Sequence, residues 1–123
     1  MFNCLAVGAG GFIGSIFRYL IGLIPLFHKG DFPFHTLIIN VVGAVVIGML
    51  VKGAEGSEAL SETTMLFLKI GLCGGFTTFS TFSLEALGLL ESGKSGLFAL
   101  YIVASVCLCI AGVFCGKWIM GVK

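Results

Sequence analysis

The stretch GGFTTFSTFSLEALG, residues 74–88, lies in the middle of a long apolar segment. It opens with two glycines and then places five hydroxyl residues and three phenylalanines within ten positions. Glycine weakens a helix, and Ser and Thr side chains offer the backbone competing hydrogen bonds. We therefore expect a break in a helix here; the alternative is an intact helix whose small residues pack against a neighbour.

The composition around this stretch is that of an integral membrane protein. The chain has 123 residues, of which 58% are hydrophobic and 11% are charged, and its mean hydropathy is +1.13. A soluble domain carries about 25% charged residues. The net charge of +1 gives no basic surface for nucleic acid. We expect one membrane domain over residues 1–123, with lipid as its surroundings.

Four segments are long and apolar enough to cross a bilayer, which takes about 20 residues. They are expected near Phe2–Leu26, Phe34–Val51, Thr64–Leu90 and Leu97–Met120. The first lacks the positive n-region of a signal peptide, so we expect it to be a retained span. Four spans place both termini on one side of a multi-pass protein in the cell membrane.

The basic residues divide almost evenly between the two sides of the membrane. The side of the termini is assigned Lys52, Lys117, Lys123 and, at the start of the third span, Lys69; the other side is assigned Lys29, Lys94 and Arg18. This small difference leaves open one weakly preferred orientation or insertion in both directions. Four helices cannot easily enclose a water-filled pore, so a transport pathway favours a subunit interface and an oligomer, most commonly a C₂ dimer.

Small residues and cysteines have a structural interpretation. The glycine-rich run Gly8–Gly14 lies inside a span and lacks the strand of a dinucleotide site, so we expect it to pack helices. The cysteines lie in apolar stretches, and Cys107 and Cys109 do not have a zinc spacing. We interpret all five as small hydrophobic residues.

Polar residues at membrane depth need an explanation. Thr36 and Asn40 are four apart and share a helix face. The Asn40 amide can join two helices through a hydrogen bond, or it can donate to a permeating anion. Phe79 and Phe82 lie close together on a helix, and the positive edges of their rings can line the path of an anion. The alternative is that these rings are ordinary core or lipid-facing aromatics.

The remaining polar residues also leave alternatives open. Arg18 can reach toward headgroups or raise the local anion concentration. Glu85 can complete a polar network, pair with Arg18 or Lys94, or take up protons in a coupled transporter. Tyr101 and Ser105, four apart, extend a hydroxyl track or simply pack. The histidines His28 and His35 flank Asp31 and are expected to be solvated in a loop.

Three passages resemble the Fluc family of fluoride channels, also called the CrcB family. They are GGFIGSIFRYLIG at 10–22, HTLIINVVGAVVIG at 35–48 and, most specifically, GLCGGFTTFSTFSLEALGL at 71–89. The likeness covers essentially the whole chain. It implies an all-α membrane protein with four transmembrane helices, the third broken in the middle, that forms a dual-topology antiparallel homodimer.

The resemblance also implies roles for individual residues. Each dimer would have two fluoride pathways, lined by Asn40, Phe79, Phe82, Thr36, Ser80, Thr81, Tyr101 and Ser105. Arg18 would lie in the vestibule and Glu85 at the far end of the polar track. The carbonyls of Gly74 and Thr77 would hold a structural Na⁺ at the dimer axis. His35 departs from an expected glycine, and Cys109 stands where some relatives have serine.

The leading hypothesis is a passive channel that exports fluoride and protects the cell, with no enzymatic chemistry. One alternative is a proton-coupled exporter of the small multidrug transporter type, which needs a glutamate in the first helix; this chain has none there. The other is a membrane subunit that transports nothing. The residues alone do not decide which small anion would pass.

Overall fold

The computed structural model describes residues 1–25, 30–55 and 60–122, and all regular secondary structure in these ranges is helical. The elements are α1 (Phe2–Gly22), α2 (Phe34–Ala54), α3 (Glu62–Met65), the π-helix η2 (Leu66–Cys73), α4 (Gly74–Phe76), α5 (Phe79–Glu91) and α6 (Ser95–Gly121). Elements α3 to α5 form one apolar run of 30 residues, so four segments can span a membrane. The predicted all-α fold with four spans, the third broken, is confirmed.

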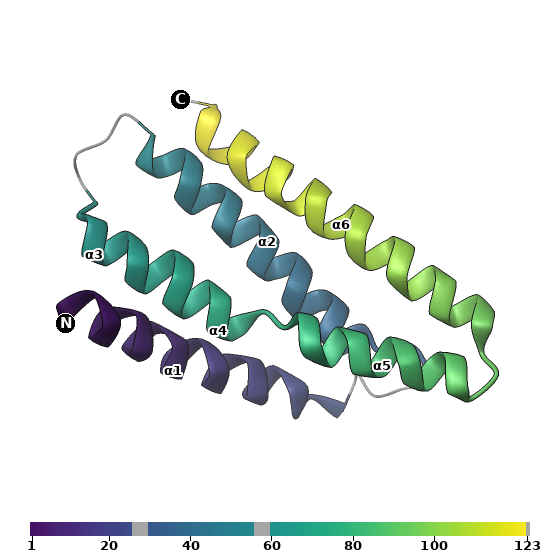
Figure 1. Cartoon of the computed structure of the whole chain (residues 1–123). Helices are drawn as coiled ribbons and strands as arrows, with labels where there is room; N and C mark the ends of the chain where they lie inside the picture. The colour runs from purple at the N-terminus through teal and green to yellow at the C-terminus, as the bar shows by residue number, and fades with distance from the viewer. Residues whose placement is uncertain (26–29, 56–59, 123) are drawn as a thin grey trace.

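The helices pack as two pairs along nearly the same direction (Figure 1). Helix α2 lies along α6, while α1 lies along η2 and α4 (Figure 1). Both termini lie at the same end of the bundle, as four spans require (Figure 1). Helix α5 continues past the end of α1 toward α6, where it joins the second pair.

Close packing between α1 and the third span depends on glycines from both. A Cβ atom added at Gly14 would overlap the carbonyl oxygen of Leu72, and one at Gly75 would lie 2.5 Å from the carbonyl oxygen of Gly11. Gly10 and Gly14 are both buried. The expected packing role of Gly8–Gly14 is confirmed for these two positions, whereas Gly8 faces open space.

The break lies at Thr77 and Thr78, just after the glycine pair. Thr77 has φ −80° and ψ 161°, and Thr78 has φ −152° and ψ 115°, both extended. Gly74 and Gly75 keep helical geometry in α4. The two glycines therefore do not form the break itself, and Gly75 instead lets the backbone of α1 approach.

Two assignments at the helix ends were wrong. The third span begins at Glu62, after the N-cap Ser61, so Lys69 lies about 10 Å inside it rather than at its start. Helix α2 begins at Phe34, so His35 lies in a helical first turn rather than in a solvated loop. Three further residues expected in loops or at the C-terminus, His28, Lys29 and Lys123, lie outside the described residues.

We expect Gly14→Ala to destabilise the protein by about 1–3 kcal/mol, because a methyl group there meets the Leu72 backbone rather than a flexible side chain. The thermal unfolding midpoint in detergent measures this loss. Gly8→Ala is the matched control on the same helix, since nothing lies within 4 Å of the added Cβ. Equal midpoints for the two variants would contradict the packing argument.

Candidate functional site

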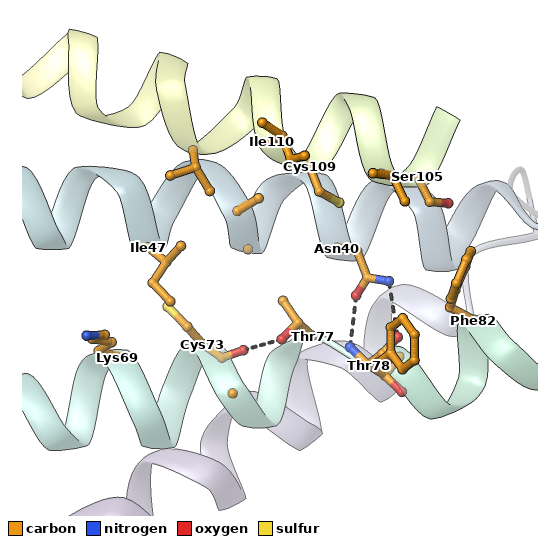
Figure 2. Close-up of a pocket in the computed structure, with 16 residues that line it drawn as sticks. Asn40, Ile47, Lys69, Cys73, Thr77, Thr78, Phe82, Ser105, Cys109 and Ile110 are labelled. Carbon is orange, nitrogen blue, oxygen red and sulfur yellow. Dashed lines mark hydrogen bonds between the residues drawn. The ribbon is translucent and has the colours of Figure 1, made fainter. Parts of the chain in front are cut away.

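The broken backbone at Thr78 is held by the side chain of Asn40 from α2. The Asn40 Nδ2 donates to the carbonyl oxygen of Thr78 at 3.1 Å, and the Thr78 backbone N–H donates to Asn40 Oδ1 at 2.8 Å (Figure 2). One amide thus replaces both hydrogen bonds that an uninterrupted helix would make at this residue. The interpretation of Asn40 as a link between helices is confirmed, and a role toward an anion stays a prediction.

The threonines of the break complete its local bonding. The Thr78 hydroxyl caps α5: it accepts from the Thr81 backbone N–H at 3.1 Å and donates to the Thr81 hydroxyl at 3.0 Å. The Thr77 hydroxyl donates to the carbonyl of Cys73 at 2.9 Å, and so does the Thr77 backbone N–H. These bonds end α4 and begin α5, and they give the N–H groups of Thr77 and Thr81 a partner within the protein.

Arg18 reaches the break from the other side. Its Nη1 donates to the carbonyl oxygen of Thr77 at 3.3 Å, across 59 residues of sequence. Helix α1 therefore contributes a cation at the same two-residue interruption that α2 holds through Asn40. The carbonyl oxygen has two lone pairs, so this bond leaves one for another donor or a cation.

A cavity of about 470 Å³ opens beside the break, between α2, the third span and α6. Six of the predicted site residues line it: Asn40, Gly74, Thr77, Phe79, Phe82 and Ser105. The Ser105 side chain is buried, and its hydroxyl makes no hydrogen bond within the described ranges. Cys109 lies one turn further along the same wall (Figure 2).

Phe79 and Phe82 stand next to one another, as their spacing predicted. Their ring centroids are 5.4 Å apart and the rings are tilted by 43°. Phe82 is only 9% exposed, whereas Phe79 is 77% exposed. Phe82 also packs on the ring of Tyr101 at a centroid distance of 5.0 Å. Phe82 therefore contacts both the cavity and Tyr101, which belongs to a polar cluster on the other side of the ring.

That polar cluster converges on the carboxylate of Glu85. Thr36 donates its hydroxyl to Oε1 at 2.8 Å, and Tyr101 donates its hydroxyl to Oε2 at 2.7 Å. His35 Nε2 lies 3.1 Å from Oε1. The prediction that Glu85 completes a polar network is confirmed.

The alternatives in which Glu85 pairs with Arg18 or Lys94 are wrong. Lys94 forms an ion pair with Asp31 at 2.6 Å, and the Arg18 guanidinium is on the Thr77 carbonyl. The prediction of a solvated His35 is also wrong. His35 lies in the first turn of α2, and its Nε2 contacts the Glu85 carboxylate of α5.

Some predicted site residues lie outside both the cavity wall and the polar cluster around Glu85, and some residues of the site were not predicted. Ser80 is exposed on α5, and Thr81 serves the cap of α5 rather than the cavity wall. Thr78 was not predicted to be a site residue, although threonine is a preferred N-cap residue. Lys69 lines the cavity although its position in the sequence indicated a helix end.

The fold and site together define a multi-pass membrane protein with one interrupted helix beside a cavity. The sequence model of the family described as "CrcB-like protein, Camphor Resistance (CrcB)" matches residues 5–117, so the chain belongs to this family. The suspected family is thereby confirmed.

Curated relatives similar to this chain carry the name "Fluoride-specific ion channel FluC". The protein from Agrobacterium fabrum is 48% identical over 117 residues, covering 94% of each chain. That from Rhizobium meliloti is 46% identical over 121 residues, covering 98% of this chain and 97% of its own. That from Ruminiclostridium cellulolyticum is 43% identical over 118 residues, covering 95% and 91%.

Replacing Asn40 with Leu should destabilise the protein by about 2–6 kcal/mol, because the Thr78 N–H and carbonyl would both lose their partners in an apolar setting, at about 1–3 kcal/mol each. The unfolding midpoint in detergent reports this loss. Ser15→Ala is the control, since its exposed hydroxyl bonds only to Gly11 within its own helix. An Asn40→Leu protein as stable as wild type would show that Asn40 does not hold the break.

Proposed function

We propose that this protein is a passive channel selective for fluoride, and a transport protein rather than an enzyme. The observation that supports this most is the cavity in which Asn40, Phe79, Phe82 and Ser105 meet beside a helix break. The identity of the ion is inferred from the family, because relatives similar to this chain are named fluoride-specific ion channels.

The chemistry of this wall suits a small, strongly hydrated anion. Fluoride must exchange water for donors, and the wall offers the second N–H of the Asn40 amide and the buried hydroxyl of Ser105. The ring edges of Phe79 and Phe82 add weak positive potential without a full charge. Conduction requires binding that is favourable enough for entry and weak enough for release, which such a wall provides.

The physiological direction follows from the acid chemistry of fluoride. HF crosses membranes as a neutral molecule, ionises inside a neutral cell and is trapped there. A passive channel in the cell membrane lets the ion leave down its electrochemical gradient. Export of fluoride, and resistance to it, need no energy source in the channel itself.

The assembly proposed is an antiparallel homodimer with two pathways. The nearly even distribution of basic residues supports insertion in both orientations. Phe79 and Phe82 are both proposed to line the pathway, yet Phe79 is 77% exposed in the single chain. A second subunit packed against this face would cover the Phe79 ring. Thr36, Tyr101 and Glu85 would then extend the pathway behind Phe82.

A structural Na⁺ held by the carbonyls of Gly74 and Thr77 is compatible with the break. Thr77 is extended, so its carbonyl leaves the helical hydrogen-bond ladder, and Gly74 lines the open cavity. When bound, Na⁺ would supply positive charge to the Gly74 carbonyl and to the lone pair of the Thr77 carbonyl that its bond to Arg18 leaves open. Carbonyl oxygens are the ligand type that hard cations prefer.

We expect purified protein in liposomes to release fluoride rapidly, and chloride not measurably, when valinomycin permits K⁺ to follow. Phe82→Ile and Asn40→Asp should each reduce fluoride efflux at least about 100-fold, since one removes a ring edge and the other places a negative charge at the donor position. A fluoride electrode measures the efflux, and size exclusion checks that each variant still assembles.

Leu84→Ile is the matched control, because Leu84 lies on the same helix as Phe82 and is 71% exposed, outside the cavity wall. Unchanged efflux in both pathway variants would overturn the assigned roles. Absence of any fluoride efflux from folded wild-type protein would favour a proton-coupled exporter or a subunit that transports nothing.

Removing Na⁺ should weaken the dimer or reduce fluoride efflux about tenfold or more, because the Gly74 and Thr77 carbonyls would lose the cation that draws them together. The test exchanges all Na⁺ for N-methylglucamine and follows efflux and size exclusion. Thr77→Ala should raise the Na⁺ concentration needed, while Thr77→Ser keeps the hydroxyl bond to Cys73 and should not. Full activity and assembly without Na⁺ would disprove the sodium site.

A further inference from the structure

Lys69 lines the same cavity as the proposed pathway residues. The wall contains no Asp or Glu among the described residues, so Lys69 is its one charged group there. Lys69 also makes no ion pair or hydrogen bond within those parts of the chain. The cavity therefore carries an uncompensated positive charge.

The position of Lys69 along the third span makes this charge notable. It lies about 10 Å inside a segment that begins at Glu62. An ionisable residue at membrane depth is costly and marks an ion or substrate pathway more often than a structural site. Snorkelling to headgroups is the alternative for a lysine near a helix end.

The side chains in Figure 2 order the cavity from end to end. Lys69 lies at one end, Asn40 and Thr78 lie further along, and Phe82 lies at the other end (Figure 2). Thr78 follows Lys69 by nine positions in the third span, which corresponds to about 13 Å along a helix. Lys69 thus faces ions that enter from its end before they reach Asn40.

We infer that Lys69 is the residue that draws fluoride into the cavity from this end, an inference that rests on the proposed function. At this distance the ammonium raises the local concentration of anions without binding them at Asn40. A full charge in the cavity wall beside Asn40 would hold a small anion too tightly for conduction, and Arg18, which bonds the Thr77 carbonyl, is not among the described residues of that wall. The separation of the charge from the donors lets the channel combine rapid entry with release.

The test compares fluoride efflux of wild type, Lys69→Gln and Lys69→Arg in neutral phosphatidylcholine liposomes. Ionic strength is set at about 0.01 M or about 0.3 M with the impermeant salt N-methylglucamine isethionate, which changes the Debye length from about 30 Å to about 6 Å. Lys117→Gln is the matched control, because Lys117 is exposed on α6 at the same end of the bundle and does not line the cavity.

At low ionic strength, Lys69→Gln should reduce efflux about three- to tenfold, while Lys69→Arg and Lys117→Gln match wild type. At high ionic strength the four proteins should converge. A Lys69→Gln protein with wild-type efflux at low ionic strength would overturn the inference, and so would a loss that is independent of salt or that Lys69→Arg shares.

Failure of the proposed function gives a different result. Wild-type protein would then pass no fluoride at either ionic strength, and the inference would fall with the function. Wild-type efflux with no effect of Lys69→Gln would leave the fluoride channel standing and remove only the role of Lys69. Size exclusion of each variant separates both results from misfolding.

Discussion

A helix can be interrupted at membrane depth here because one side chain replaces both hydrogen bonds that Thr78 would make in a continuous helix. The Asn40 amide gives and accepts one bond each at Thr78, at 3.1 and 2.8 Å. Without such a partner, each free backbone group in a bilayer costs several kcal/mol. Everything beyond the break, including the direction of α5 and the positions of Phe79, Phe82 and Glu85, depends on this exchange being complete.

The second requirement is that the segment before the break cannot move. Gly14 and Gly75 bring the backbones of α1 and the third span into direct contact, and Arg18 of α1 then reaches the Thr77 carbonyl. Two helices therefore hold adjacent residues of the same interruption from different sides. A wall built on so rigid a support can keep small donors in place, which selection among small anions requires.

The sequence predicted the parts of this structure that follow from local physics. Hydropathy located the four spans, and the hydroxyl-rich stretch predicted the break and the contact between Phe79 and Phe82. The sequence did not indicate which residue of the stretch would break the helix, because a glycine pair can either weaken a helix or let a neighbouring backbone pack closely. The close approach of the α1 backbone to Gly75 shows that this glycine serves packing rather than the break.

The errors at His35 and Lys69 have a common cause. Both residues stand near the start of an apolar segment, where a charged or titratable side chain normally indicates the membrane surface. Helix α2 begins at Phe34, as the hydropathy indicates, and the third span begins at Glu62, two residues before the predicted start, so both side chains belong to a helix rather than to a loop or a helix end. Their contacts then depend on neighbours that are distant in sequence, Glu85 for one and the cavity wall for the other.

Lys69 and Glu85 give each chain an asymmetric charge distribution along the proposed pathway. Lys69 leaves one end positive, while the Glu85 carboxylate at the other end is bonded to the hydroxyls of Thr36 and Tyr101 and faces His35. Donors on both carboxylate oxygens reduce the repulsion that Glu85 would otherwise exert on an anion. In an antiparallel pair, the two pathways would run in opposite senses, so the dimer as a whole would present the same surface to both sides. An antiparallel arrangement thereby makes an asymmetric pathway consistent with passive flow in either direction.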